Sequence, residues 1–395
     1  MKKNRIMVSK STPSPSHPKN SGGNGRRDKL HFSWAPTLSY GKTWNFAIGE
    51  RESGKSVDSW FMLFHAFIYE GRPSLVLRRR IADITEVYLK DTEKVLNKFL
   101  PEDRQIQLVF RKGQIKDGVI DVHLGKAGES YSWQGIDRLP VFFRAIGLST
   151  PMSRIKSNVL ANVKWIFFDE FICNLRMGER YLGDERFLIQ EIYTTYNRET
   201  SKPIRIIMAG NPYSVYNPIF SSLSVDSTRL TPGSFIVGDD YAIDCFQTPP
   251  ELKAQILERN PMYQFDDAYK RYAFGGEAVN DQNIKLRKKE PRGYTLKYVF
   301  KAGSKFLAIH RRKSPEFGED RFWICVHSGD WYKRISAHRT IWCFNFADLM
   351  ANARIYSGIE QMQQLRELKE AMNNREVSFN CVDAEYLMED IYTLL

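Results

Sequence analysis

Residues 43–56 read TWNFAIGERESGKS, a run of β-forming apolar residues that ends at Gly49 and leads into a loop containing a second glycine. The next residues, 57–71 (VDSWFMLFHAFIYEG), have the length and apolar content of a helix closed by Gly71. The stretch therefore predicts a strand, a tight loop and a helix in direct succession. Within it, Gly49–Ser56 matches the pattern G-x-x-x-x-G-K-[ST], which in this setting indicates a phosphate-binding loop.

The spacing of this loop has a chemical reason. Its backbone N–H groups can surround a β-phosphate, Lys55 can reach the β- and γ-phosphates, and Ser56 can offer a hydroxyl to Mg²⁺. With average residue usage, the four fixed positions arise by chance in roughly 1–2% of chains of this length. The predicted ATP-binding residues are Gly49, Glu50, Arg51, Glu52, Ser53, Gly54, Lys55 and Ser56.

A second apolar run, Val163–Phe171 (VKWIFFDEF), ends in two adjacent carboxylates. Such a run is typical of a strand that is covered on both faces of a parallel sheet. Unpaired buried charge is costly, so the two acids indicate a functional edge; the alternative is that both face solvent at the strand end. We predict that Asp169 holds Mg²⁺ and that Glu170 polarises the attacking water, which favours hydrolysis over transfer to a bound acceptor.

Two arginines are candidates for the same site. Arg51 lies inside the loop, where it could lean over the γ-phosphate or pair with Glu50 or Glu52 at the surface. Arg198, in the sequence YNRE, could act as an arginine finger on the nucleotide of a neighbouring subunit, or be a solvated residue at a helix end.

Two uncharged side chains complete the candidate set. Asn211 ends the apolar run Pro203–Pro212 (PIRIIMAGNP), where it could sense the γ-phosphate or simply form an Asn-Pro turn. Tyr40, upstream of the loop, is a candidate for holding the adenine.

The remaining pattern suggests four parts. Residues 1–29 are basic and rich in Ser, Pro, Gly and Asn, and predict a disordered arm. Residues 30–230 alternate strands and helices, with hairpins expected at 105–125 and 130–136, and predict a doubly wound, mostly parallel α/β domain. Residues 231–290 predict a linker or lid with short helices at 250–259 and 265–276, and residues 291–395 predict a smaller α+β domain of antiparallel strands and two helices.

Composition excludes several classes of protein. The chain has 395 residues, 42% of them hydrophobic, which permits a large core and excludes wholesale disorder. No stretch approaches the roughly 18 apolar residues of a membrane span, and residues 1–10 lack the apolar core of a secretory signal. The five cysteines show no C-x-x-C spacing, so reduced thiols are expected rather than a zinc site or a disulfide framework.

The net charge of +12 favours a polyanionic partner. Basic residues concentrate in the arm, in KLRKKEPR (285–292) and in HRRK (310–313). Arg311, Arg312 and Lys313 are therefore candidate nucleic-acid contacts, although such runs can also serve only to hydrate a surface.

The chain resembles the genome-packaging ATPases (large-terminase-like encapsidation proteins) of small tailed podoviruses with protein-primed replication. The stretches that carry the resemblance are, in order, LSYGKTWNFAIGERESGKS, LVLRRR, VKWIFFDEF, YNRE and IRIIMAGNPYSVYNPIF. The resemblance implies a P-loop ATPase of the ASCE type that uses ATP and Mg²⁺ and works as a homo-oligomeric ring, five-fold in the family. Its implied partners are double-stranded DNA, the portal of a prohead and a packaging RNA. The implied location is the host cytoplasm, with transient residence on the prohead.

The resemblance also implies residue roles. Gly49–Ser56 correspond to the Walker A loop, Asp169 and Glu170 to the Walker B pair, Arg51 to the loop arginine and Ala209–Asn211 to a coupling segment. Arg198 matches the finger that acts in trans, although Tyr196 stands where relatives can show another arginine. The arginines that end LVLRRR match a basic pair implied to contact another subunit or DNA.

In this family the second domain is built like an RNase H-type nuclease. Two-metal cleavage needs several carboxylates brought together, usually beginning with an acid on the first strand. The candidate strand KFLAIHRR (305–312) has no acid, and Asp330, Asp348 and Asp383 fall in loops or helices. We therefore expect a domain that is degenerate as a nuclease and serves as a nucleic-acid platform.

The leading hypothesis is an ATP-driven motor that translocates double-stranded DNA. A full terminase would in addition cut DNA through residues 290–395. An assembly protein would bind nucleotide without hydrolysing it and would bind nucleic acid through its basic arm. A helicase also fits a P-loop with an Asp-Glu pair, although no further helicase signature is present.

Overall fold

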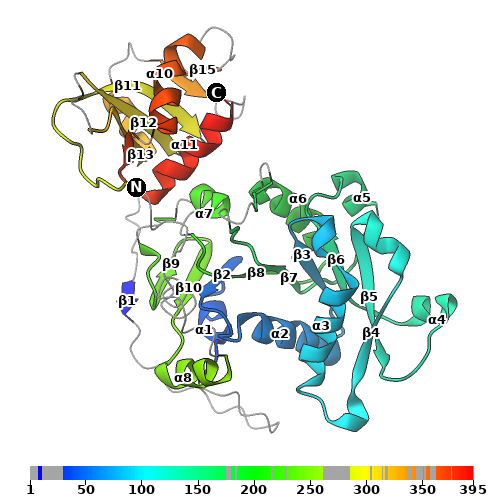
Figure 1. Ribbon diagram of the computed structural model, residues 1–395. Helices are drawn as coiled ribbons and strands as arrows, with labels where there is room; N and C mark the ends of the chain where they lie inside the picture. The colour runs from blue at the N-terminus through cyan, green and yellow to red at the C-terminus, as the bar shows by residue number, and fades with distance from the viewer. Residues whose placement is uncertain are drawn as a thin grey trace. The chain divides into compact units, whose positions relative to one another are not determined.

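The computed structural model of the chain describes residues 8–10, 30–157, 159–174, 179–182, 185–214, 217–223, 225–226, 229–260, 285–302, 305–313, 315, 319–335, 340–343, 350, 353–355, 362–374 and 376–394. The chain divides into two compact units, shown in Figure 1. The first comprises Met1–Tyr213 and Leu230–Val279, and the second comprises Ser214–Arg229 and Asn280–Leu395. The helix predicted at 265–276 and the candidate Asp348 lie outside the described residues.

A ten-stranded sheet forms the frame of the first unit, with the strand order β1-β9-β10-β2-β8-β7-β3-β6-β5-β4. The six central strands run parallel, as the long apolar runs predict, and the outer strands pair antiparallel. The parallel strands are β10 (Tyr241–Phe246), β2 (Trp44–Gly49), β8 (Arg205–Gly210), β7 (Trp165–Asp169), β3 (Ser74–Arg78) and β6 (Val141–Gly147). The outer strands are β1 (Val8–Lys10), β9 (Ser234–Val237), β5 (Val119–Lys126) and β4 (Ile106–Phe110).

Helices cover both faces of this sheet (Figure 1). On one face, α2 (Lys55–Glu70) buries Trp60 and Leu63, and α3 (Glu86–Asn97) buries Leu89, in one cluster with the strand residues Phe143 and Phe167. Figure 1 shows α5 (Met152–Lys156) and α6 (Glu185–Asn197) on the opposite side. The predicted doubly wound α/β architecture is therefore confirmed, and β6 is a central strand that the sequence pattern did not single out.

Three sequence-based expectations differ from the structure of the first unit. The segment predicted as a linker or lid from residue 231 contributes β9 and β10, and only its helix α8 (Pro250–Arg259) was anticipated. Residues 130–136 form no hairpin, because the Ser132 side chain accepts a hydrogen bond from Gly135 N at 3.1 Å and starts helix α4 (Trp133–Arg138). The arm predicted to be disordered contains β1, which pairs with β9.

The outer strand β4 has side chains bonded to its free backbone edge. Glu93 and Asn97, both on α3, accept hydrogen bonds from the N–H groups of Leu108 at 2.6 Å and Ile106 at 2.9 Å. Asn97 also donates to the carbonyl of Ile106 at 2.8 Å. These bonds occupy three of the backbone groups with which an additional strand could pair.

The second unit contains a six-stranded sheet of order β15-β14-β11-β12-β13-β16. The antiparallel meander predicted from the sequence is formed by β11, β12 and β13, but β14 and β15 extend it in the parallel sense, which corrects the expectation of purely antiparallel strands. The two predicted helices are α10 and α11. The bounds are β11 (Tyr294–Ala302), β12 (Lys305–Arg312), β13 (Phe322–Ser328), β14 (Ile341–Cys343), β15 (Ala353–Ile355), β16 (Val377–Phe379), α10 (Met362–Asn373), α11 (Val382–Leu394) and, in the same unit, α7 (Pro218–Ser222).

Among the described residues, no helix combines the length and the apolar character that crossing a bilayer requires.

Candidate nucleotide site

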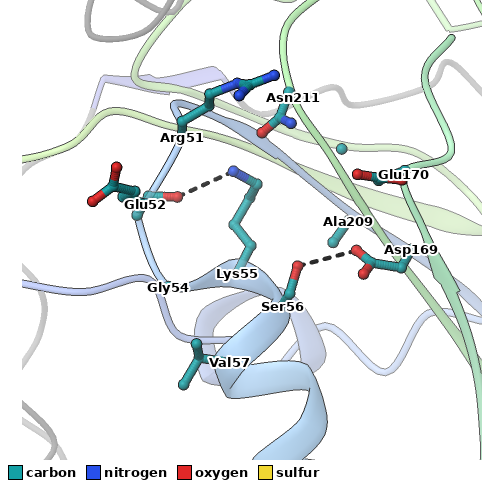
Figure 2. Close-up of a pocket in the computed structure, with 12 residues that line it drawn as sticks. Arg51, Glu52, Gly54, Lys55, Ser56, Val57, Asp169, Glu170, Ala209 and Asn211 are labelled. Atoms are coloured by element: carbon teal, nitrogen blue, oxygen red, sulfur yellow. Dashed lines mark hydrogen bonds between the residues drawn. The ribbon is translucent and has the colours of Figure 1, made fainter. Parts of the chain in front are cut away.

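Strand order and register bring the phosphate loop, Asp169, Glu170 and Asn211 to one edge of the large sheet. The strand β8 lies between β2 and β7, with Gly210 beside Ile48 and Ala209 beside Asp169. Because the strands are parallel, the loop after β2, the acids ending β7 and the turn after β8 all open at the same edge. A pocket of about 410 Å³ lies there (Figure 2). It is lined by Arg51, Glu52, Ser53, Gly54, Lys55, Ser56, Val57, Asp169, Glu170, Ala209, Gly210 and Asn211.

The phosphate loop has the backbone shape that its glycines allow. Gly54 has φ of 93°, a left-handed conformation that most side chains disfavour, and it caps the start of α2. A Cβ at Gly49 would lie 2.8 Å from the carbonyl oxygen of Phe246 on the neighbouring β10. Gly54 is thus required by its backbone conformation, and Gly49 is required because the neighbouring strand leaves no room for a side chain.

The Lys55 ammonium is folded back into the loop. It donates to the carbonyls of Gly49 at 2.8 Å and Glu50 at 2.7 Å and to the Ser53 hydroxyl at 3.1 Å, and Figure 2 shows the side chain reaching from the start of α2 toward the loop. Burial lowers the pKa of Lys55 to about 7, against the opposing effect of nearby Asp169. A buried cation held by a few carbonyls is suited to receive a negatively charged phosphate.

Ser56 and Asp169 form the pair expected for Mg²⁺. The Ser56 hydroxyl donates to Asp169 Oδ1 at 3.0 Å (Figure 2). The pKa of Asp169 is raised to about 6, chiefly by burial and to a lesser extent by the adjacent Glu170, against the opposing effect of Arg78. A hydroxyl and a buried carboxylate oxygen are ligands that Mg²⁺ prefers, so the residues present fit the ion.

Arg78 also belongs to the site, although its position in the sequence did not predict this. It ends β3, whose register sets Leu77 beside Phe168 of β7, so that the two strand ends adjoin. Its guanidinium lies 2.7 Å from Glu170 Oε2 and 3.8 Å from Asp169 Oδ2. The family resemblance implied a subunit or DNA contact for this arginine, but within this chain it pairs with the Walker B acids.

Two loop residues connect the pocket to the segments around it. Arg51 lines the pocket and donates to the Tyr213 hydroxyl at 2.9 Å. Glu50 is fully buried; it accepts a hydrogen bond from Thr248 N at 3.0 Å and lies 2.9 Å from the Lys253 ammonium on α8.

The chain before β2 also contacts the loop. Phe32 N donates to the Ser53 carbonyl at 2.9 Å, and the indole of Trp34 donates to Ser59 on α2 at 2.8 Å. The aromatic spacing in HFSW (31–34) was the one sequence signal for this contact. Tyr40, the residue proposed for adenine, lies against Phe235 of β9 and does not line the pocket.

The other two candidates are separated by the fold. Asn211 lines the pocket, between Arg51 and Glu170 in Figure 2. Arg198 is exposed and follows the end of α6, and it does not line this pocket. Tyr196, by contrast, is buried and accepts a hydrogen bond from Arg144 at 3.3 Å.

In the second unit, part of the predicted basic surface is neutralised. Arg311 lies 2.6 Å from Glu367, and Arg312 lies 2.8 Å from Glu319, while Lys313 is exposed. Their contact with nucleic acid remains a prediction.

The first strand of the second sheet in chain order is β11, which has no acid, whereas the predicted first strand KFLAIHRR is β12. Asp330 pairs with Lys333 at 2.9 Å, and Asp383 pairs with Lys305 at 2.6 Å. Over the part of the chain that the structure describes, no group of three or more His, Cys, Asp or Glu residues is arranged to hold a metal ion.

No family model matches the chain. It is 25% identical over 362 residues to the DNA packaging protein of Bacillus phage PZA and, to the same extent, to that of Bacillus phage phi29; the match covers 89% of this chain and 93% of each relative. The fold is similar to that of the Phi-28 gp11 DNA packaging motor, with a TM-score of 0.59 and 18% identity over 93% of this chain and 98% of that one. It is also similar to a chain of the bacteriophage Phi-29 viral genome packaging motor assembly, with a TM-score of 0.58 and 20% identity over 92% and 99%. From these matches, and from the site that its motifs build, the chain is a homologue of the DNA packaging proteins of Bacillus phages PZA and phi29.

Proposed function

We propose that this protein is the ATP-hydrolysing subunit of a motor that translocates double-stranded viral DNA into a prohead. The observation that carries the proposal is the convergence of Lys55, the Ser56–Asp169 pair and Glu170 on one pocket. Similarity to DNA packaging proteins over most of both chains supports the choice of DNA as cargo.

The chemistry follows from the residues of the pocket. The loop N–H groups and Lys55 bind the triphosphate, while Ser56 and Asp169 hold Mg²⁺, which when bound neutralises charge on the β- and γ-phosphate oxygens. Glu170 orients a water molecule and takes its proton as the water oxygen bonds to the γ-phosphorus and the bond to ADP breaks. The products are ADP and inorganic phosphate. Arg51 and Asn211, next to the same space, are proposed to contact the γ-phosphate and to transmit its loss.

A homo-oligomeric ring is the assembly that fits this activity. Arg198 is exposed at the end of α6 and is proposed to complete the site of an adjacent subunit. The relatives' names support a motor assembly, and the pentameric number, the portal contact and a packaging RNA are the finer parts of the proposal. A sequence-independent grip on DNA phosphates suits a motor that must move along any sequence.

The test is ATP hydrolysis with and without double-stranded DNA, together with protection of DNA from nuclease by proheads. We expect Lys55→Ala to abolish nucleotide binding and turnover, and Glu170→Gln to abolish turnover while ATP still binds. Glu102→Gln, a change at an exposed acid, is the control and should behave as wild type. Turnover that survives in Glu170→Gln would remove the assignment of the base, and a wild-type chain that binds ATP without hydrolysing it would refute the motor.

A further inference from the structure

The turn that carries Glu170 has a backbone conformation that needs support. Glu170 has φ of 58°, in the left-handed region that residues with a side chain seldom occupy. Such a conformation persists when surrounding contacts hold it, and it is often found at functional sites. The direction of the Glu170 carboxylate therefore depends on what fixes this turn.

Arg79, next to Arg78 on the chain, bonds to the backbone of this turn. Its guanidinium donates to the carbonyl of Glu170 at 3.2 Å and to the carbonyl of Phe171 at 2.7 Å. A guanidinium can do this because its donors form a planar fork, whereas an ammonium cannot bond in the same fixed plane. Neighbouring arginines thus contact the same turn in two ways: Arg78 bonds to the side chain of Glu170 and Arg79 to the main chain.

Arg79 is itself held by Glu185, the first residue of α6. Arg79 Nε lies 2.5 Å from Glu185 Oε1, and the same oxygen accepts a hydrogen bond from Leu182 N at 2.9 Å. The guanidinium also lies 5.4 Å from the ring centre of Phe168 and 5.2 Å from that of Tyr181. Glu185 is fully buried and Arg79 is 8% exposed, so little water can compete with these contacts.

The supported turn also adjoins the end of β8. Phe171 N donates to the carbonyl of Ala209 at 3.3 Å, and a Cβ on Gly210 would lie 2.9 Å from the Phe171 ring. A shift of the turn would therefore disturb both the Glu170 carboxylate and the strand that leads to Asn211. Neither Arg79 nor Glu185 lines the pocket, so any effect they have on turnover is indirect.

We propose that Arg79 and Glu185 are positioning residues for ATP hydrolysis, which fix the turn at Glu170 so that its carboxylate faces the pocket. The inference rests on the proposed ATPase function. It assigns the buried Arg79–Glu185 pair to the geometry of the water-activating base rather than to nucleotide binding or to stability alone.

The experiment compares Arg79→Lys and Glu185→Gln with wild type for steady-state ATP hydrolysis and for the affinity of a fluorescent ATP analogue. Arg79→Lys keeps the charge but loses the fork, and Glu185→Gln keeps an acceptor but loses the charge. In each variant we expect kcat to fall about 10- to 100-fold, as small misplacements of catalytic groups produce. The nucleotide affinity should stay within about threefold of wild type, because the phosphate loop is untouched.

Asp121→Asn supplies a control for loss of a buried ion pair. Arg144 and Asp121 form such a pair in the same sheet, with Nε and Oδ1 2.6 Å apart and Arg144 buried, and neither residue lines the pocket. We expect Asp121→Asn to lower the thermal unfolding midpoint but to keep wild-type kcat below that midpoint.

Three outcomes separate the hypotheses. Normal kcat in Glu185→Gln and Arg79→Lys, with a lowered midpoint like that of Asp121→Asn, would overturn the inference and leave only a structural role. A raised KM with unchanged kcat would overturn it as well, since nucleotide binding would be the step affected. If the wild-type chain itself hydrolyses no ATP, the proposed function fails first.

Discussion

The guanidinium of Arg78 lies between the two Walker B acids, 2.7 Å from Glu170 Oε2 and 3.8 Å from Asp169 Oδ2. The Asp169 side chain is only 13% exposed, whereas that of Glu170 is 60% exposed. The guanidinium therefore chiefly offsets the cost of the mostly buried Asp169 charge before a nucleotide brings its own cation.

Arg78→Gln is expected to shift the pH dependence of ATP hydrolysis. Arg78 is the main influence that lowers the pKa of Asp169, which burial raises to about 6. Without the guanidinium this pKa rises further. As the pH is lowered, Asp169 is then protonated at a higher pH, and Mg²⁺ binding is lost at that higher pH. The acidic limb of the kcat/KM profile should move up by about one pH unit. Arg104→Gln, at an exposed arginine, should leave the limb in place, and an unmoved limb in Arg78→Gln would contradict the interpretation.

Asp169→Asn should abolish Mg²⁺-dependent hydrolysis and stabilise the nucleotide-free protein at neutral pH. The pKa of Asp169 is raised on folding from 3.8 to about 6, so its folded state binds more protons than the unfolded state between those values. In the wild type, the contribution of Asp169 to the free energy of unfolding is therefore fully present below about pH 4 and is lost as the pH rises through 6. The variant escapes that loss, on the order of 1–3 kcal/mol.

Urea unfolding at pH 4.5 and pH 7.5 measures the effect, with Asp91→Asn at an exposed position as the control. The gain in Asp169→Asn should be larger at pH 7.5 than at pH 4.5. An equal or reversed difference would rule out desolvation of Asp169 as the cause.

Nucleotide binding at pH 8 should be accompanied by proton uptake at Lys55. Burial lowers the pKa of this lysine to about 7, so most of the ammonium groups are deprotonated at pH 8. A bound triphosphate places negative charge beside the amine and raises its pKa, so that the amine takes up nearly one proton from solution. Calorimetry in two buffers of different ionisation enthalpy detects this exchange. Equal binding enthalpies in both buffers would show that Lys55 is already charged.

Gly49→Ala should weaken both the fold and nucleotide binding. Its new Cβ would meet the Phe246 carbonyl oxygen at 2.8 Å, and a main-chain atom of a central strand cannot move aside easily. We expect a loss of about 1–3 kcal/mol, typical of overpacking. Gly113→Ala has open space around its Cβ and serves as the matched control, with a change within about 0.5 kcal/mol. Comparable thermal midpoints for the two variants would contradict the steric argument.

Much of the site could be predicted from sequence because it lies on contiguous motifs. The loop at Gly49–Ser56 and the acids at Asp169 and Glu170 are each recognisable within a few consecutive residues. In the structure Arg51–Ser56 and both acids line one pocket, while Gly49 and Glu50 do not. Periodicity also revealed β2, β3, β7 and β8, since each is a short apolar run with clear ends.

What the sequence could not reveal is which strands are neighbours. Arg78 belongs to the site only because β3 lies beside β7, and no local pattern encodes that adjacency. Likewise, the sequence gives no sign that Glu50 is buried. Its ion-pair partner Lys253 is about two hundred residues away in the chain, so the pairing depends on the fold. The strands β9 and β10 were missed for a related reason: their place in the sheet depends on a partner from much earlier in the chain, since β10 lies beside β2 and β9 pairs with β10.

The side-chain bonds from Glu93 and Asn97 to the margin of β4 bear on how copies of this protein can associate. When chains pack closely together, unpaired edge strands can pair with one another to form one continuous sheet, and such pairing is hard to reverse. With three backbone groups of this edge already bonded within the chain, we expect association along it to rely on side chains. Contacts between side chains can form and break repeatedly.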